Sequence, residues 1–183
     1  MSEITCFMVE PTERASRWLR RFVFNSSCSS RTGIHDAQVA IEEAPLVRTE
    51  RGTFCVNPME WPHDDPRWPT HCACGYEFGE NDEWQLNYHP IYRRPDTGEE
   101  FTLGLHQTPP GAMWYADWSW HKGPDGRCLV VMTPGGEWMI DAPSSGGNPW
   151  TRTGTPPLVT ANPSILIPGH YHGWLRDGKL VEC

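Results

Sequence analysis

The sequence predicts a mainly β fold, a single compact domain of short antiparallel strands and hairpins with long loops rich in proline and glycine. Glycine (17) and proline (18) are frequent without a fixed period, which favours many turns between short strands. Ten tryptophans supply large buried surfaces, although hydrophobic residues make up only 38% of the chain. The core is therefore expected to be small and aromatic.

Residues 1–50 are expected to form N-terminal strands. The run TCFMVEP predicts a strand, whereas the apolar spacing of ASRWLRRFVF fits neither the helical nor the strand period. After the polar cluster NSSCSSRTG, which is typical of turns, the run HDAQVAIEEAPLVR alternates Ala37, Val39 and Ile41. That alternation predicts a half-buried strand.

Residues 51–78 are expected to form a proline-rich loop that carries a metal site. Four prolines lie between residues 52 and 70, and they remove the backbone donors that regular pairing needs. We expect this loop to be ordered by Trp61 and Trp68, with either aromatic packing or a metal ion as the anchor.

The rest of one domain over residues 1–183 is predicted as three parts. Residues 79–141 are expected to form a β meander, most clearly in WSWHKGPDGRCLVVMTPGGEWMID, where β-prone runs flank turns. Residues 142–163 are rich in Gly, Pro, Ser and Thr and predict a long loop. Residues 164–183 are expected to form C-terminal strands around the turn at Asp177-Gly178.

Charge and hydropathy narrow the classes of partner. With a formal net charge of −8, the chain as a whole lacks the positive charge that binds nucleic acids and anionic lipids. No apolar run approaches the roughly 20 residues of a membrane span. The start MSEITCFMVE does not resemble a secretory signal. We therefore expect neither nucleic acid nor membrane as a partner, and a reducing intracellular location in which the seven cysteines serve as thiols or metal ligands.

The run HCACGYEF suggests a zinc site. Cys72 and Cys74 are two potential thiolate ligands, and Gly75 permits the bend that a C-x-C pair needs to bind one ion. The first hypothesis completes the site with Cys55 and one histidine, His63 or His71. The second completes it with two histidines of GHYHGW, namely His170 and His172.

An alternative interpretation makes Cys55, Cys72 and Cys74 ordinary half-buried thiols. The remaining cysteines and histidines are expected in core or surface positions rather than as ligands. They are Cys6, Cys28, Cys128, Cys183, His35, His89, His106 and His121.

No motif of a catalytic zinc site, a P-loop or a serine hydrolase occurs in the chain. The protein is therefore expected to be non-enzymatic. The alternative is a zinc-dependent hydrolase that acts on a host or viral substrate, with an open metal position near His170, His172 and an acid such as Asp141.

The aromatic run MWYADWSWH raises a third hypothesis, a ligand-binding face. Strand alternation places Trp114, Trp118 and Trp120 on the same side. Such a face forms either part of the core or a stacking platform for a ligand.

Several long strings resemble a family of uncharacterised proteins from tailed bacteriophages and prophages. They are DPRWPTHCACGYEF, DTGEEFTL, PPGAMWYADW, GPDGRCLVVMTPGGEWMID and PSILIPGHYHGWLRDGKL, and together they cover about residues 60 to 181. The C-x-C pair followed by PSI and HGWLRDG is also similar to a bacterial domain family of unknown function, some of whose genes lie beside ubiquitin-like conjugation components. The phage family also carries cysteines in the loop after WMID, and this chain has none there, so a role that depends on them is in doubt.

The phage resemblance implies a viral protein located in the host cytoplasm or in the virion. Its expected role is that of a structural or protein-binding accessory, with virion proteins or a host factor as partners. Oligomer formation stays open.

Overall fold

The computed structural model describes residues 3–24, 28, 33–46, 61–102, 108–143 and 150–183. These residues are all strand, turn or loop, without a helix, so the prediction of a mainly β protein is confirmed. The described chain divides into two compact units, one with residues 3–11 and 92–183 and one with residues 12–46 and 61–91. We call them unit 1 and unit 2 and describe each by itself. The prediction of one domain over residues 1–183 stays a prediction.

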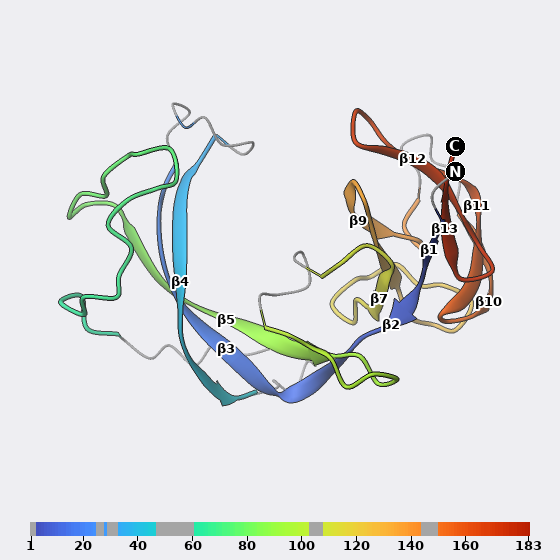
Figure 1. Ribbon diagram of the computed structural model, residues 1–183, viewed down its shortest axis with the longest axis horizontal. Helices are drawn as coiled ribbons and strands as arrows, with labels where there is room; N and C mark the ends of the chain where they lie inside the picture. The colour runs from blue at the N-terminus through green and yellow to red at the C-terminus, as the bar shows by residue number, and fades with distance from the viewer. Residues whose placement is uncertain (1–2, 25–27, 29–32, 47–60, 103–107, 144–149) are drawn as a thin grey trace. The chain divides into compact units, whose positions relative to one another are not determined.

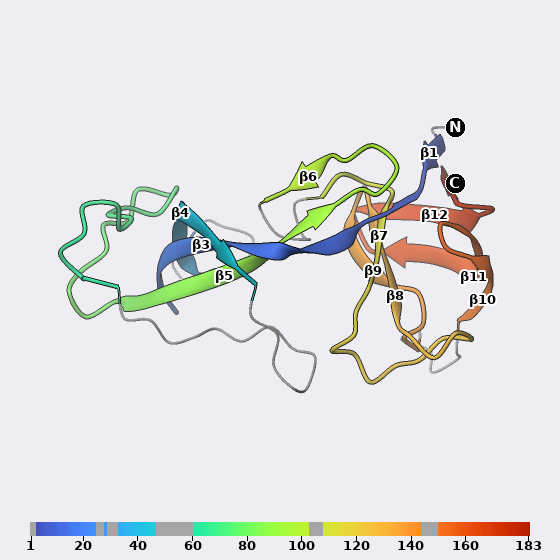
Figure 2. The same ribbon diagram turned by 90° about the horizontal axis from the view of Figure 1, so that it is seen from below.

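Unit 1 contains a five-stranded antiparallel sheet in the order β1-β13-β12-β11-β10 (Figure 1). Its strands are β1 (Glu3–Thr5), β10 (Thr151–Thr155), β11 (Leu158–Ile167), β12 (Tyr171–Arg176) and β13 (Lys179–Glu182). The hairpin β12-β13 turns at Asp177 and Gly178, both at positive φ, as the Asp-Gly pair predicts. Figure 2 shows β10, β11 and β12 side by side.

A second sheet of unit 1 has the order β2-β7-β8-β9. Its strands are β2 (Phe7–Met8), β7 (Ala112–Tyr115), β8 (Leu129–Thr133) and β9 (Gly136–Met139). The β7-β8-β9 meander is antiparallel, whereas β2 pairs with β7 in parallel. Residues 112–139 thus contain a three-stranded meander, whereas residues 83–93 and 100–101 of the predicted 79–141 meander pair in a different sheet. The first strand of the meander ends at Tyr115 instead of continuing through residues 118–122, because Ser119 N–H donates to Ala116 O and closes a turn.

The core of unit 1 lies on both faces of this second sheet. One cluster joins Met113, Leu129 and Val131 to Val159 and Leu175 of the five-stranded sheet. A separate cluster covers the opposite face around Trp114 and Val130. Every residue of β8 is therefore buried, which explains its unbroken apolar run.

The predicted long loop over residues 142–163 is wrong in its second half. Residues 151–155 and 158–163 belong to the antiparallel hairpin β10-β11. Threonine is β-branched and suits strands, while Pro156 and Pro157 occupy the connection between them. Pro163 lies where the β11-β12 register shifts between Ala161 and Ile165, a position that tolerates a missing N–H group.

A third sheet has the order β4-β3-β5-β6. Its strands are β3 (Glu10–Val23), β4 (His35–Pro45), β5 (Glu83–Arg93) and β6 (Glu100–Phe101). Trp18 and Leu19 are adjacent in β3 and are both buried, at 8% and 0% exposure. Burial of both faces removes the alternation, which is why ASRWLRRFVF shows no clear period although it is a strand.

Within its described residues 61–82, the segment between β4 and β5 belongs to no sheet (Figure 1). It contains turns and one isolated antiparallel bridge between His71 and Glu77. This bridge brackets the C-x-C pair and positions the site described next. The described part of the chain contains no helix long and apolar enough to cross a membrane.

Candidate metal centre

Four side chains of unit 2 bring ligand atoms together. They are Cys28, His35, Cys72 and Cys74, whose potential ligand atoms all lie within 4.8 Å of one another. Within the described residues, this is the group of three or more His, Cys, Asp or Glu side chains suited to hold a metal ion. We call it the Cys3His cluster.

The distances in the Cys3His cluster match a small tetrahedral site. Cys28 Sγ lies 3.9 Å from Cys72 Sγ, and His35 Nδ1 lies 3.2 Å from Cys74 Sγ. A tetrahedron with zinc–sulfur bonds of about 2.3 Å has edges of about 3.8 Å. The 3.9 Å separation is also much longer than a disulfide bond of about 2.05 Å, so Cys28 and Cys72 are separate thiols at a spacing that fits two ligands of one ion.

A tight turn presents Cys72 and Cys74 to the same point. Gly75 N–H donates to Cys72 O at 2.9 Å, and Cys72 N–H donates to Tyr76 O at 2.8 Å. Gly75 has a φ of 92°, a left-handed conformation that residues with a β-carbon rarely adopt. The sequence argument that Gly75 permits the bend is therefore confirmed.

The other two members of the cluster are Cys28, which follows β3 in the chain, and His35, the first residue of β4. His35 opens β4 and pairs with Val23 at the end of β3, while Cys28 lies between these strands. Tyr76 stacks on the His35 ring with centroids 4.1 Å apart, and its hydroxyl donates to Asp82 at 3.1 Å. This stack fixes the orientation of the imidazole. Residues that contact the ligands of a metal commonly orient them in this way.

Burial and electrostatics favour a cation at this point. Cys28, His35 and Cys72 are only 8%, 3% and 6% exposed. The backbone hydrogen bond of Cys74 lowers the pKa of Cys72. The backbone hydrogen bond of Tyr76 lowers the pKa of Cys74. Desolvation and the nearby thiols of Cys72 and Cys28 together raise that pKa by more, so its net shift is upward. Neighbouring thiolates repel one another, and a bound cation removes that repulsion.

Aromatic packing provides a second anchor for residues 61–82. The Arg21 guanidinium lies 3.7 Å from the centroid of the Trp84 ring, and it donates a hydrogen bond to Gly79 O. Trp68 is 6% exposed and donates to Pro62 O at 2.7 Å. Aromatic packing, one of the two anchors considered from the sequence, is thus present in this segment, and the Cys3His cluster supplies donor atoms suited to the other, a metal ion.

The remaining predicted ligands lie elsewhere or outside the described residues. His71 is exposed, with Nδ1 2.9 Å from Thr70 Oγ1, and His63 stacks on Trp84 with centroids 4.6 Å apart. His172 Nε2 lies 3.3 Å from Ser164 Oγ, and His170 is exposed in the turn before β12. Cys55 falls outside the described residues. The structure therefore brings Cys72 and Cys74 together with Cys28 and His35, and places these four histidines outside the cluster.

The predicted tryptophan face is divided. Trp114 is 3% exposed and belongs to the core of unit 1, whereas Trp118 and Trp120 are 63% and 81% exposed. The turn after Tyr115 ends the strand alternation on which the common face depended. Only Trp118 and Trp120 are available to a ligand or a partner.

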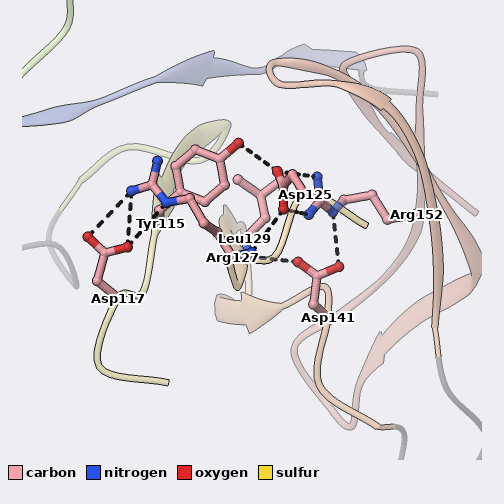
Figure 3. A network of polar contacts seen from close by, with 7 residues as sticks. All are labelled: Tyr115, Asp117, Asp125, Arg127, Leu129, Asp141 and Arg152. Atoms are coloured by element: carbon pink, nitrogen blue, oxygen red, sulfur yellow. Dashed lines mark hydrogen bonds and ion pairs between the residues drawn. The ribbon is translucent and has the colours of Figure 1, made fainter. Parts of the chain in front are cut away.

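Unit 1 holds a second buried polar group, which we call the Arg152 network (Figure 3). Arg152 Nε donates to Asp141 Oδ1 at 2.9 Å, and its other nitrogens donate to the two oxygens of Asp125 at 2.7 and 3.2 Å. Leu129 N–H donates to Asp141 Oδ2 at 2.7 Å. Both oxygens of Asp141 are engaged, and its side chain is 3% exposed, so it is poorly placed to act as the general base of the hydrolase hypothesis.

Sequence reasoning missed Cys28 and His35. The run NSSCSSRTGIHD was interpreted only as a turn followed by a strand. A cysteine within a turn-forming segment and a histidine just after it were a usable signal, because such a turn returns the chain toward its own start.

Comparisons with protein-family models, with curated proteins and with solved structures found no match to this chain.

Proposed function

We propose that this protein is a zinc-stapled β protein in which a structural zinc ion, bound by Cys28, His35, Cys72 and Cys74, holds residues 61–82 against the β3-β4 connection. The observation that carries the proposal is the convergence of four donor atoms within 4.8 Å. In this proposal the protein is a non-enzymatic accessory that binds other proteins.

The donor set selects the metal. Thiolate and imidazole ligands suit zinc, while calcium and magnesium prefer oxygen ligands. Three sulfur donors and one nitrogen donor make a common structural zinc set. Four protein ligands fill a tetrahedral ion and leave no position for a reactive water, which favours a structural ion over a hydrolytic one.

Support for protein binding comes from the exposed aromatic side chains of unit 1. Trp118 and Trp120 are 63% and 81% exposed, and tryptophan is enriched in protein–protein interfaces. The phage resemblance extends the proposal to a virion component or a factor in the host cytoplasm. Mass spectrometry of purified particles, in which the protein is either present or absent, tests that extension.

Metal content tests the zinc proposal. We expect about one zinc per chain in the purified wild type by plasma mass spectrometry, and loss of that zinc in Cys28→Ser and Cys72→Ser, because each variant removes a ligand. Cys183→Ser is the matched control, since Cys183 is an exposed thiol of unit 1. Cys55→Ser separates the two ligand sets and is expected to keep its zinc.

A wild type that takes up no zinc under reducing conditions would overturn the proposal. Zinc lost in Cys55→Ser but kept in Cys28→Ser would move the site to the ligand set first expected from the sequence.

A further inference from the structure

The three thiols of the Cys3His cluster differ in their access to solvent. Cys28 and Cys72 are 8% and 6% exposed, whereas Cys74 is exposed at the turn. A solute that reaches the cluster therefore meets the Cys74 sulfur first. This inference rests on the proposed zinc site.

We infer that Cys74 is a peroxide-reactive modification site, at which oxidation joins Cys74 to Cys28 in a disulfide and releases the zinc ion. The oxidant belongs to the class of small hydroperoxides, with hydrogen peroxide as the simplest member.

The first step is attack of the Cys74 thiolate on the peroxide O–O bond. Metal binding keeps the thiol deprotonated, and the thiolate is the nucleophile in sulfur oxidation. A sulfur–oxygen bond forms and the O–O bond breaks, which gives a sulfenic acid on Cys74 and one hydroxide ion. Sulfur is oxidised by two electrons and the peroxide is reduced by the same two.

In the second step the Cys28 thiolate attacks the sulfenic sulfur. The sulfur–sulfur bond forms and a second hydroxide ion leaves. In total, two thiolates, one hydrogen peroxide and two protons give one disulfide and two water molecules. No further oxidant or reductant is needed.

Cys28 is favoured over Cys72 as the resolving thiol. The Cys28 and Cys74 ligand atoms lie within 4.8 Å of each other and come from separate segments, so a small movement joins them. Cys72 and Cys74 are two residues apart in a turn closed by the Gly75–Cys72 hydrogen bond. A disulfide within that pair would have to distort the turn to reach the required dihedral geometry.

Zinc release follows from the loss of two ligands. A disulfide between Cys28 and Cys74 leaves only Cys72 and His35, and a structural zinc site needs four donors. Residues 61–82 then keep their aromatic anchor at Arg21 and Trp84 but lose the metal staple. The modification would thus loosen this segment without unfolding the strands beneath it.

The experiment begins with zinc-loaded protein whose metal content has been measured. Hydrogen peroxide is added in stoichiometric to tenfold amounts, released zinc is followed with a chromogenic chelator, and disulfides are mapped by peptide mass spectrometry. We expect about one zinc released per chain, a Cys28–Cys74 disulfide, and recovery of zinc binding after reduction with dithiothreitol. Cys183→Ser is expected to behave as the wild type.

Cys74→His is the decisive variant, because imidazole is a zinc ligand that cannot form a disulfide. We expect it to keep its zinc at peroxide concentrations that empty the wild type. Equal release from Cys74→His would overturn the inference. If that variant does not load zinc, the wild-type disulfide map decides instead, and a map without Cys74 overturns the inference.

The two proposals fail in different ways. A wild type that never loads zinc overturns the zinc staple and this inference together. A zinc-loaded wild type that keeps its zinc under peroxide overturns the inference alone.

Discussion

The Arg152 network of unit 1 and the Cys3His cluster of unit 2 are both groups of polar side chains with buried members, and they differ in how their charge is balanced. In the network, Arg152 lies between Asp125 and Asp141, with two of its own hydrogen bonds to Asp125. In the cluster, three thiols and one imidazole converge without a cationic side chain among them. The chain itself balances the charge of the first group, whereas in our proposal the second is completed by a metal ion.

The two groups join distant segments of the chain in two different ways. Arg152 on β10 connects the five-stranded sheet to Asp141, which follows β9 of the second sheet. The Cys3His cluster connects segments with a small apolar core: among the described residues, Cys28, Cys72 and Phe78 are buried there, with Ala37 and Tyr76 packed against them. A segment with little apolar burial depends on another source of stability.

Metal removal is expected to have the largest effect, and only in unit 2. Structural zinc sites contribute about 10–16 kcal/mol of apparent binding free energy in small peptides, so chelation should greatly increase amide hydrogen exchange in residues 61–82. Exchange in β8 and β12 of unit 1 should stay unchanged. Equal protection of residues 61–82 with and without chelator would contradict the comparison.

Acidification is expected to have the second-largest effect, and to affect the Cys3His cluster at a higher pH than the Arg152 network. Protons compete with zinc for thiolate and imidazole ligands, so the Cys3His cluster should bind zinc far more weakly at pH 5 than at pH 7. In the Arg152 network, the hydrogen bond from Arg152 holds the pKa of Asp125 well below its usual range.

The sign of the Asp125 contribution follows from that direction. A lowered folded-state pKa stabilises the fold above the unfolded value of about 3.9, and the contribution is lost as the pH falls below it. We therefore expect zinc release by pH 5 while the unit 1 strands keep their hydrogen-exchange protection. A pH titration of zinc content beside exchange measurements checks both halves, and loss of unit 1 protection together with zinc would contradict the prediction.

Breaking the Arg152 network should destabilise unit 1 without affecting zinc. Arg152 and Asp141 side chains are 2% and 3% exposed, and removal of one partner from such a buried pair costs about 3–5 kcal/mol. Asp141→Ala should therefore lower the urea midpoint of unit 1 and keep its zinc. Lys179→Ala is the control, because the Lys179–Glu3 pair is exposed and is expected to contribute less than about 1 kcal/mol.

A smaller effect is expected from the glycine that packs on this network. A β-carbon at Gly123 would overlap the Arg152 guanidinium and the Asp141 carboxylate. Gly123→Ala should lower the free energy of unfolding of unit 1 by about 1–3 kcal/mol, as overpacking does. Gly79→Ala is the control, because nothing lies within 4 Å of its added carbon. Equal urea curves for the two variants would show that the Arg152 network rearranges around the added carbon without a loss of stability.

The sequence predicted the elements whose information is local. The β class, the strand HDAQVAIEEAP and the Asp177-Gly178 hairpin all follow from alternation and turn residues within a few positions of one another. The bend of Cys72-Ala73-Cys74-Gly75 is local in the same sense, because glycine at positive φ closes it. The hairpin β10-β11 was missed because Gly, Pro and Thr near Gly154 and Pro156 have the composition of a loop, and only pairing reveals the strands.

Tertiary structure alone decided which residues complete the metal centre. Cys28 and Cys72 are 44 residues apart in the chain. The positions of cysteines and histidines in the sequence do not show which of them meet in space across such a separation. The pairing of Val23 with His35 joins the end of β3 to the start of β4, and the fold brings Cys28 and His35 beside the C-x-C turn. By itself, the sequence determined that two thiols would face one point. The long-range pairing of strands, which buries apolar side chains far apart in sequence, determined which thiol and which imidazole would meet them there.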